Sequence, residues 1–115
     1  MSSANLTLTS ATAATIVASF VEPTTNVDGT PITNLKQTNV SISFDAGVSY
    51  TPIAVDLASN AGGGGSRTKT VLGVVVPTTA SSAIVRLVAE NTVGFKSDSV
   101  DITVSIARPI PNPVG

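Results

Sequence analysis

The chain has 115 residues and no Cys or His, and its six Lys and Arg against seven Asp and Glu give a net charge of −1. The missing side chains exclude disulfides, thiol catalysis, Cys-based zinc sites and nucleophilic catalysis by a Ser-His-Asp triad. The weak net charge, the scattered basic residues and the scarcity of aromatic rings argue against nucleic acid and against an anionic membrane surface as partners.

Short segments in which apolar and polar residues alternate follow one another along the chain. Alternation with a period of two is typical of half-buried strands, whereas a short continuous apolar run is typical of a strand inside a sheet. The alternating segments are 6–8, 14–20, 40–44, 53–57, 85–89 and 100–106, and the continuous run is 71–76. No segment has a convincing helical period, and none is apolar for the 18 residues that a membrane span requires.

Turn-forming residues separate these segments. They occupy residues 26–31, 45–47, 62–65, 77–79 and 91–94. Seven or eight short strands at this spacing predict an all-β sandwich or barrel. The four consecutive glycines at 62–65 predict a mobile loop at the tip of a hairpin.

The C-terminal segment differs in character from the rest of the chain. Residues 108–115 read Arg-Pro-Ile-Pro-Asn-Pro-Val-Gly, with Pro at alternate positions. Such a segment cannot join the interior of a sheet and is expected to run extended. We therefore predict an N-terminal arm over 1–4, a sandwich over 5–107 and a Pro-rich arm over 108–115. A linker, a disordered end and an arm laid on a neighbouring subunit all fit this composition.

Two patches carry a resemblance to fibronectin type III domains. The family pattern Val-x-Val-x-Ala-x-Asn-x-x-Gly-x-Ser runs from strand F into strand G, and it is matched here by Val85, Leu87, Ala89, Asn91, Gly94 and Ser97, with one additional residue before the Ser. The segment from strand B to strand C is similar to a second run, which contains Phe20, Pro23, Asp28, Gly29, Pro31 and Ile32. The resemblance implies an immunoglobulin-like sandwich of about seven strands in two antiparallel sheets.

The chain departs from the family at three large aromatic positions. Phe20 stands at the Trp of strand B, Leu35 at the Tyr of strand C, and Ala83 near the corner Tyr of strand F. Aliphatic or smaller groups thus replace the family's anchors, and related immunoglobulin-like domains with the same layers remain open.

Four sets of residues are candidates for chemical or binding sites. Asn26-x-Asp28-Gly29 lacks the further acidic ligands of a calcium loop and is interpreted as a turn. Asp98 and Asp101 are three residues apart along a predicted strand, so they point to opposite faces and are not a paired acid and base. The glycines at 62–65 lack the spacing of a phosphate-binding loop. Tyr50 and Phe95 are a weak basis for a carbohydrate platform. No catalytic residue, metal ligand or cofactor is predicted.

Charge makes up 11% of the chain, against about 25% in an average domain. Edge strands are usually protected by charged side chains, so weakly charged edges favour burial against partners. A surface coated with Ser and Thr on a secreted module accounts for the composition equally well.

These features lead us to expect a non-enzymatic structural or assembly protein whose partners are proteins, either neighbouring subunits or its own copies in a possible homo-oligomer. Domains that resemble this one are common as virion accessories, so the resemblance implies a decoration subunit of a bacteriophage capsid or tail, located in the virion; a start at Met1 without a secretion signal agrees. The alternative is an extracellular spacer or binding module of a bacterial enzyme or adhesin. Partner contacts are expected from the arm, at Arg108, Pro109, Ile110, Pro111 and Pro113.

Overall fold

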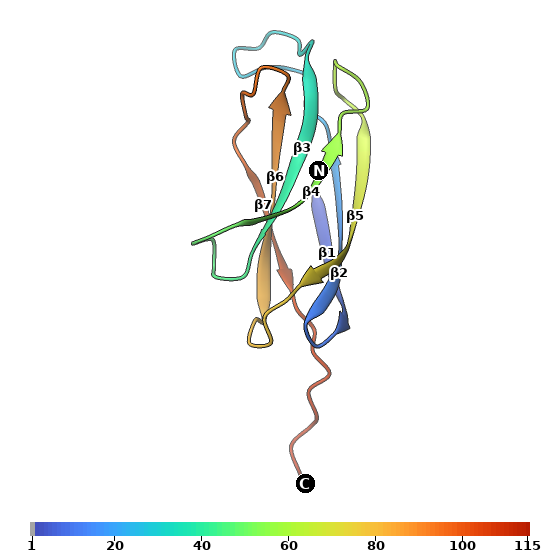
Figure 1. Ribbon diagram of the computed structural model, residues 1–115, viewed down its shortest axis with the longest axis vertical. Coiled ribbons are helices and arrows are strands. Elements are labelled where there is room, and N and C mark those ends of the chain that lie inside the picture. Colours follow the sequence, from blue (N-terminus) through green and yellow to red (C-terminus); the bar gives the residue numbers. More distant parts are fainter. Residues whose placement is uncertain (1) are drawn as a thin grey trace.

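The computed structural model describes residues 2–115 as seven strands in two antiparallel sheets packed face to face (Figure 1). The strands are β1 (Ser3–Ser10), β2 (Ala13–Val21), β3 (Leu35–Ser43), β4 (Thr51–Leu57), β5 (Ser66–Val75), β6 (Ser82–Asn91) and β7 (Val100–Ser105). One sheet has the order β1-β2-β5 and the other the order β4-β3-β6-β7. Each predicted segment falls in a strand, and the all-β sandwich of two antiparallel sheets is confirmed. The apolar run 71–76 was predicted as a strand inside a sheet, which is wrong, because it belongs to β5 at the edge of the three-stranded sheet. β1 begins at Ser3, two residues before the predicted start of the domain.

The core is built from aliphatic side chains on the facing sides of the two sheets. Along β2 every second residue is buried, as the alternating sequence predicts. The inward residues of β2 meet those of β3, β6 and β7 in one cluster, which includes Ile16, Ala18, Phe20, Val40, Ile42, Val85, Leu87 and Val104. Full burial of one Val, Ile or Leu side chain contributes about 1.5–3 kcal/mol, so this cluster is the main source of stability.

The three positions that depart from the resembled family all lie in the interior. Phe20 is 5% exposed, Leu35 is 6% exposed and Ala83 is 2% exposed. The side chains that replace the family's aromatic anchors are therefore still core residues, and the smaller groups pack against an aliphatic interior.

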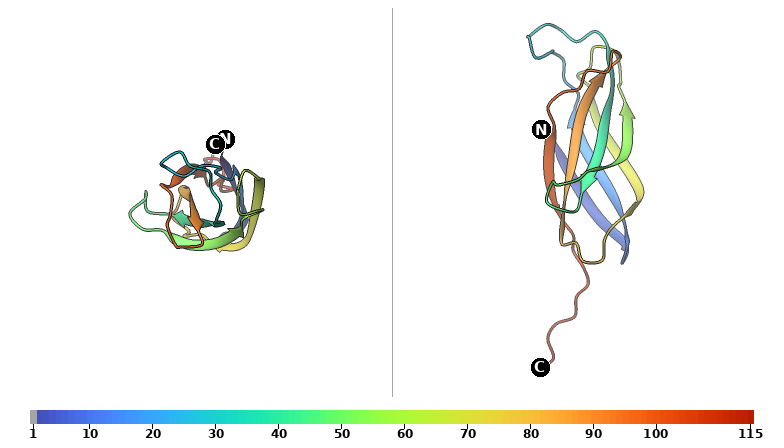
Figure 2. Two further views of the ribbon diagram at one scale, coloured as in Figure 1. Left: turned by 90° about the horizontal axis from the view of Figure 1, so that it is seen from above. Right: turned by 60° about the vertical axis from the view of Figure 1, so that its left-hand side comes forward.

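The molecule, including its C-terminal arm, is elongated, with extents of 63 × 24 × 21 Å and a radius of gyration of 16.2 Å, where a compact domain of this length has about 13 Å. Connections gather at its two ends (Figures 1 and 2). We call one end the loop end, formed by residues 22–34, 58–65 and 92–99. The opposite end is the arm end, formed by residues 11–12, 76–81 and 107–115, where the C-terminal segment leaves the domain along its long axis.

Residues 2–115 include no helix that is long and apolar enough to cross a membrane.

Candidate interaction surfaces

A buried carboxylate organises the loop end. Glu22, just after β2, is 3% exposed and accepts hydrogen bonds from the backbone N–H of Ser59 at 2.9 Å and of Gly65 at 3.0 Å, and from the Ser59 hydroxyl. Burial by itself raises the pKa of Glu22, but these hydrogen bonds and the positive charge of Arg67 outweigh burial and hold the pKa below its ordinary value. The ionised carboxylate therefore fastens the loop of residues 58–65 to the end of β2.

The glycine loop is not the mobile hairpin tip that the sequence predicted. It joins β4 to β5, which lie in different sheets and do not pair, so it crosses from one layer to the other. Gly63 has a φ of 70°, and a Cβ there would overlap the carbonyl oxygen of Pro23. The glycines thus serve a close approach between two backbones. Three of their four amides are occupied, since Gly62 N–H bonds Asn60 Oδ1 at 2.9 Å, Gly63 N–H bonds the Asn60 carbonyl at 3.2 Å and Gly65 N–H bonds Glu22. The glycines therefore do not form a phosphate cradle.

The residues that carry the family resemblance shape the turn between β6 and β7. Asn91 Oδ1 accepts the backbone N–H groups of Val93, Gly94 and Phe95 at 3.1, 3.0 and 3.0 Å. Gly94 has a φ of 101°, which favours glycine. Below the turn Ser97 N–H bonds the Ala89 carbonyl at 2.8 Å, and its hydroxyl accepts the Ala89 N–H at 2.9 Å. The Asn-x-x-Gly-x-x-Ser spacing is therefore a device for closing this loop.

Asp28 closes a turn, as predicted. Its Oδ1 accepts the Thr30 N–H at 3.0 Å and the Thr30 hydroxyl at 2.6 Å, and these hydrogen bonds lower its pKa. Within residues 2–115 no three acidic, His or Cys side chains come together as a metal site would require.

A stack of three side chains lies on the outer face of the four-stranded sheet. Arg86 on β6 forms a two-pronged salt bridge with Asp101 on β7, at 2.9 and 3.0 Å, and its guanidinium lies 3.7 Å from the centre of the Tyr50 ring. The Arg86 hydrogen bond lowers the pKa of Asp101. The Tyr50 ring face is therefore covered by a cation. Asp98 takes no part in this pair, and Phe95, which is 73% exposed, stands alone in its loop.

At the arm end the Arg108 guanidinium holds loops together by hydrogen bonds, as the Glu22 carboxylate does at the loop end. Arg108 donates hydrogen bonds to the carbonyls of Ala80 at 3.1 Å, Ala11 at 3.1 Å and Pro77 at 2.7 Å. It thereby joins the turn between β1 and β2 to the loop between β5 and β6. Arg108 was predicted as a partner-binding residue; in the structure its guanidinium donates hydrogen bonds to carbonyls of its own chain.

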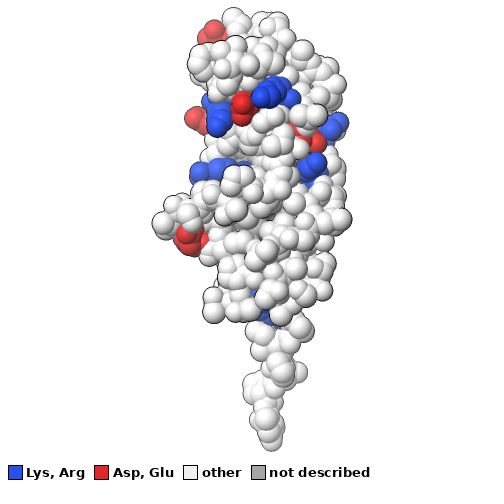
Figure 3. All heavy atoms as spheres, viewed as in Figure 1, with Lys and Arg blue, Asp and Glu red and all other residues white. Residues whose placement is uncertain are grey.

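The other predicted arm residues leave the domain. Pro109, Ile110, Pro111 and Pro113 are exposed, and Ile110 is 78% exposed. Residues 109–115, like residues 11–12 and 76–81, carry no charged side chain. In the view of Figure 3 the charged groups gather mostly on the half of the domain away from the arm. The arm and the two connections beside its base thus carry no charged side chain, whereas Arg108 is tied to the domain and the exposed Asp45 lies next to residues 79–82.

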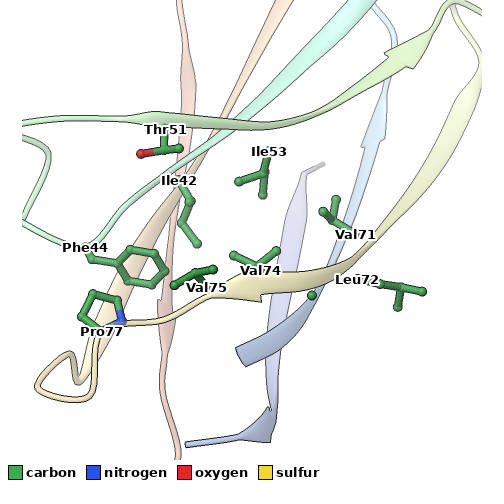
Figure 4. Close-up of a pocket in the computed structure, with 10 residues that line it drawn as sticks. Ile42, Phe44, Thr51, Ile53, Val71, Leu72, Val74, Val75 and Pro77 are labelled. Atoms are coloured by element: carbon green, nitrogen blue, oxygen red, sulfur yellow. The ribbon is translucent and has the colours of Figure 1, made fainter. Parts of the chain in front are cut away.

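An apolar groove of about 420 Å³ opens between the edge strands β4 and β5 (Figure 4). The pairing of β2 with β5 shifts register near Gly73, which has a φ of 66°, so β5 bulges there. Phe44 is half-buried at the groove wall, and Leu72 and Val75 beside it are 77% and 76% exposed. This groove was not predicted, although a Gly inside the apolar run 71–76 is a signal for a bulge in the sequence.

Comparisons with protein-family models, with curated proteins and with solved structures gave no match.

Proposed function

We propose that this chain is a fibronectin type III-like, non-enzymatic assembly subunit that decorates a larger protein particle, a bacteriophage capsid or tail. The observation that carries the proposal is the arm over 109–115, which has no charged side chain, is exposed throughout and leaves the sandwich beside two uncharged connections, residues 11–12 and 76–81. Binding to a protein surface buries such a segment at little desolvation cost, because it contains no charge to remove from water.

The rigid base of the arm supports the same function. Arg108 ties two loops together at the point where the arm begins, so the arm leaves from a fixed position. Each residue before a Pro is biased to an extended backbone, and Pro itself has a fixed φ. An arm with few conformations loses little entropy when it binds, which favours association.

Six of the thirteen charged residues have contacts that support a structural role rather than catalysis. Glu22 holds a loop, Arg86 pairs with Asp101, Arg67 pairs with Asp56 at 2.9 Å, and Arg108 holds carbonyls. Each of these groups has a partner within the chain that accounts for its position.

The fibronectin type III relation is supported by strand positions. The two resembling patches lie where the family places them, from β2 into β3 and from β6 into β7. β4 pairs with β3 in the four-stranded sheet, so the sheets differ from the ABED and CFG division of constant immunoglobulin domains.

The test is to purify virus particles from the source strain on a density gradient and to count copies of this chain by mass spectrometry against the major shell protein. We expect a fixed ratio of small integers. Absence of the chain from the particles, with its recovery from the culture medium inside a longer polypeptide, would overturn the proposal. That outcome would support the second candidate, an extracellular spacer module, which the exit of the arm along the long axis also suits.

A further inference from the structure

The sandwich has four edge strands, and they are unequally protected. β4 carries Pro52 and Asp56, β5 carries Arg67 and Lys69, and β7 carries Asp101. Charges, prolines and bulges on an edge prevent another strand from adding to it. β1 (Ser3–Ser10), with the sequence Ser-Ala-Asn-Leu-Thr-Leu-Thr-Ser, has no charge and no Pro, and its pairing with β2 is regular as far as Leu8. β1 is therefore the one edge without charge or proline to block pairing.

The outer side of β1 has no paired strand, although β7 of the other sheet lies next to β1. In the described part of the chain β1 pairs with β2 alone and is the outermost strand of its sheet. A groove of about 650 Å³ runs beside its second half, lined by residues 6–11 and 107–109. Half of the N–H and C=O groups of any edge strand point away from its one neighbour, so β1 offers unpaired backbone groups along this side.

The arm has a backbone that can pair on one side only. In an extended chain, consecutive residues direct their N–H groups to opposite edges. Pro109, Pro111 and Pro113 therefore leave one edge of the arm without donors, while Ile110, Asn112 and Val114 place theirs on the other. Such a segment is suited to the outermost position of a sheet, with its Pro side toward solvent.

The donors of this pairing side are accessible. The N–H groups of Asn112 and Val114 bond nothing within residues 2–115, and the Ile110 N–H bonds the Arg108 carbonyl in a tight local turn at 2.8 Å. Opening that turn exchanges one hydrogen bond for another when the arm pairs with a strand.

We propose that residues 110–114 of one copy add to β1 of a second copy as an outer strand, which enlarges the three-stranded sheet to four. This inference rests on the proposed function and names the partner, a second copy of the chain, and the contact. A neighbouring copy is the recipient because Arg108 directs the arm away from its own β1, along the long axis (Figures 1 and 2). The Pro side then stops further addition, so one arm closes one edge.

The first measurement is the mass of the full chain by light scattering over a concentration series. Reciprocal exchange of arms gives a dimer, and one-way exchange gives longer chains; either supports the proposal. A mass of one chain, 11.5 kDa, at all concentrations would overturn it, including the variation in which the arm folds back on its own β1.

Two matched pairs of variants then test the backbone pairing. Asn112→Pro removes the central donor of the pairing side and is expected to weaken self-association about tenfold, which is about 1.4 kcal/mol. Pro111→Ala changes the solvent side and should leave association within about twofold, since it removes no donor from the pairing side. Nonspecific apolar association predicts the reverse order, because Asn112→Pro makes the arm more apolar; equal or stronger association of that variant would contradict the proposal.

The second pair tests the recipient edge. Thr7 on β1 and Thr103 on β7 are both exposed residues of edge strands. Thr7→Lys should weaken self-association about tenfold, as a charge on an edge strand does, while Thr103→Lys should not. Equal effects would place the contact elsewhere and reject β1. Amide hydrogen exchange of the associated protein should show protection at Asn112 and along β1, and checks that each variant is folded.

These outcomes are separable from the proposed function. Particles that contain the chain in a fixed ratio, together with a monomer in solution, would reject the exchange of arms and keep the assembly role. Self-association through β1 by a chain that is absent from particles would do the opposite.

Discussion

Each end of this sandwich is organised by one charged side chain. The two side chains have opposite charge and differ in burial. At the loop end Glu22 is buried, and its partners, Ser59 and Gly65, come from a single loop. At the arm end Arg108 is half-buried, and its carbonyl partners come from two separate connections, after which the chain continues into solvent. The carboxylate closes one end of the domain, whereas the guanidinium builds a base from which an arm extends. The two ends therefore differ in what they expose: the loop end is closed by hydrogen bonds within the domain, whereas the arm end leaves residues 109–115 in solvent.

The loop end is most sensitive at its closest backbone approach. Gly63→Ala should destabilise the fold by about 2–4 kcal/mol, because the new Cβ overlaps the Pro23 carbonyl and the φ of 70° disfavours any L side chain. Gly29→Ala is the matched control: its φ is 87° but a Cβ there meets no atom within 4 Å, so only the conformational cost of about 1 kcal/mol remains. Urea denaturation measures both, and equal losses would contradict the close approach.

Removing the carboxylate tests the closure itself. Glu22→Ala should cost about 2 kcal/mol, since buried N–H groups of Ser59 and Gly65 lose their acceptor, and Glu22→Gln should cost less because it keeps one acceptor oxygen. Urea denaturation at neutral pH gives the order, and an Ala variant as stable as the parent would show that the loop closes without Glu22.

The same residue links stability to pH. Folding lowers the pKa of Glu22, so its contribution is fully present above the unfolded pKa of about 4.3 and is lost as pH falls through the lower folded value. The parent should therefore lose more stability than Glu22→Gln between neutral pH and the acid range. Parallel curves of unfolding free energy against pH for the two proteins would show that the Glu22 carboxylate does not link stability to pH.

At the arm end two truncations separate the base from the arm. Ending the chain after Arg108 should leave the melting temperature unchanged, because residues 109–115 are exposed. Ending it after Ala107 also removes three hydrogen bonds and should cost about 1 kcal/mol, or roughly 4 °C. Full-chain Arg108→Ala should match the second truncation. Calorimetry compares them, and equal melting temperatures for the two truncations would show that Arg108 stabilises nothing.

The smallest effect is expected at Asp45, which lies in the connection between β3 and β4 and forms its contacts within that connection. Hydrogen bonds from Ser49, and then from Ser43, lower the pKa of Asp45 to about 2. Ser49→Ala should raise that pKa toward its ordinary value, as followed by the carboxyl carbon shift in an NMR titration. A pKa near 4 in the parent protein would contradict the geometry of this loop.

The strands were predictable because burial leaves a period of two in the sequence. Residues 14–20 and 100–106 alternate so regularly that both were identified as strands. Asn91 and Gly94 marked the turn between β6 and β7. The glycines at 62–65 misled us, because flexibility in an isolated chain and close packing in a folded one both require glycine. The role of Arg108 was equally hidden, since Ala11, Pro77 and Ala80 are distant in sequence.

The sequence by itself determined the class of fold, a count of seven or eight strands, the absence of charged side chains over 109–115 and the exclusion of His and Cys chemistry, because these follow from composition and local alternation. Tertiary structure alone decided which strands are edges, that β4 pairs with β3 while β5 joins the opposite sheet, and which carbonyls Arg108 holds. The reason is physical: local patterns record which side of a strand is buried, whereas edges, crossings and ties between distant loops depend on how the two sheets pack.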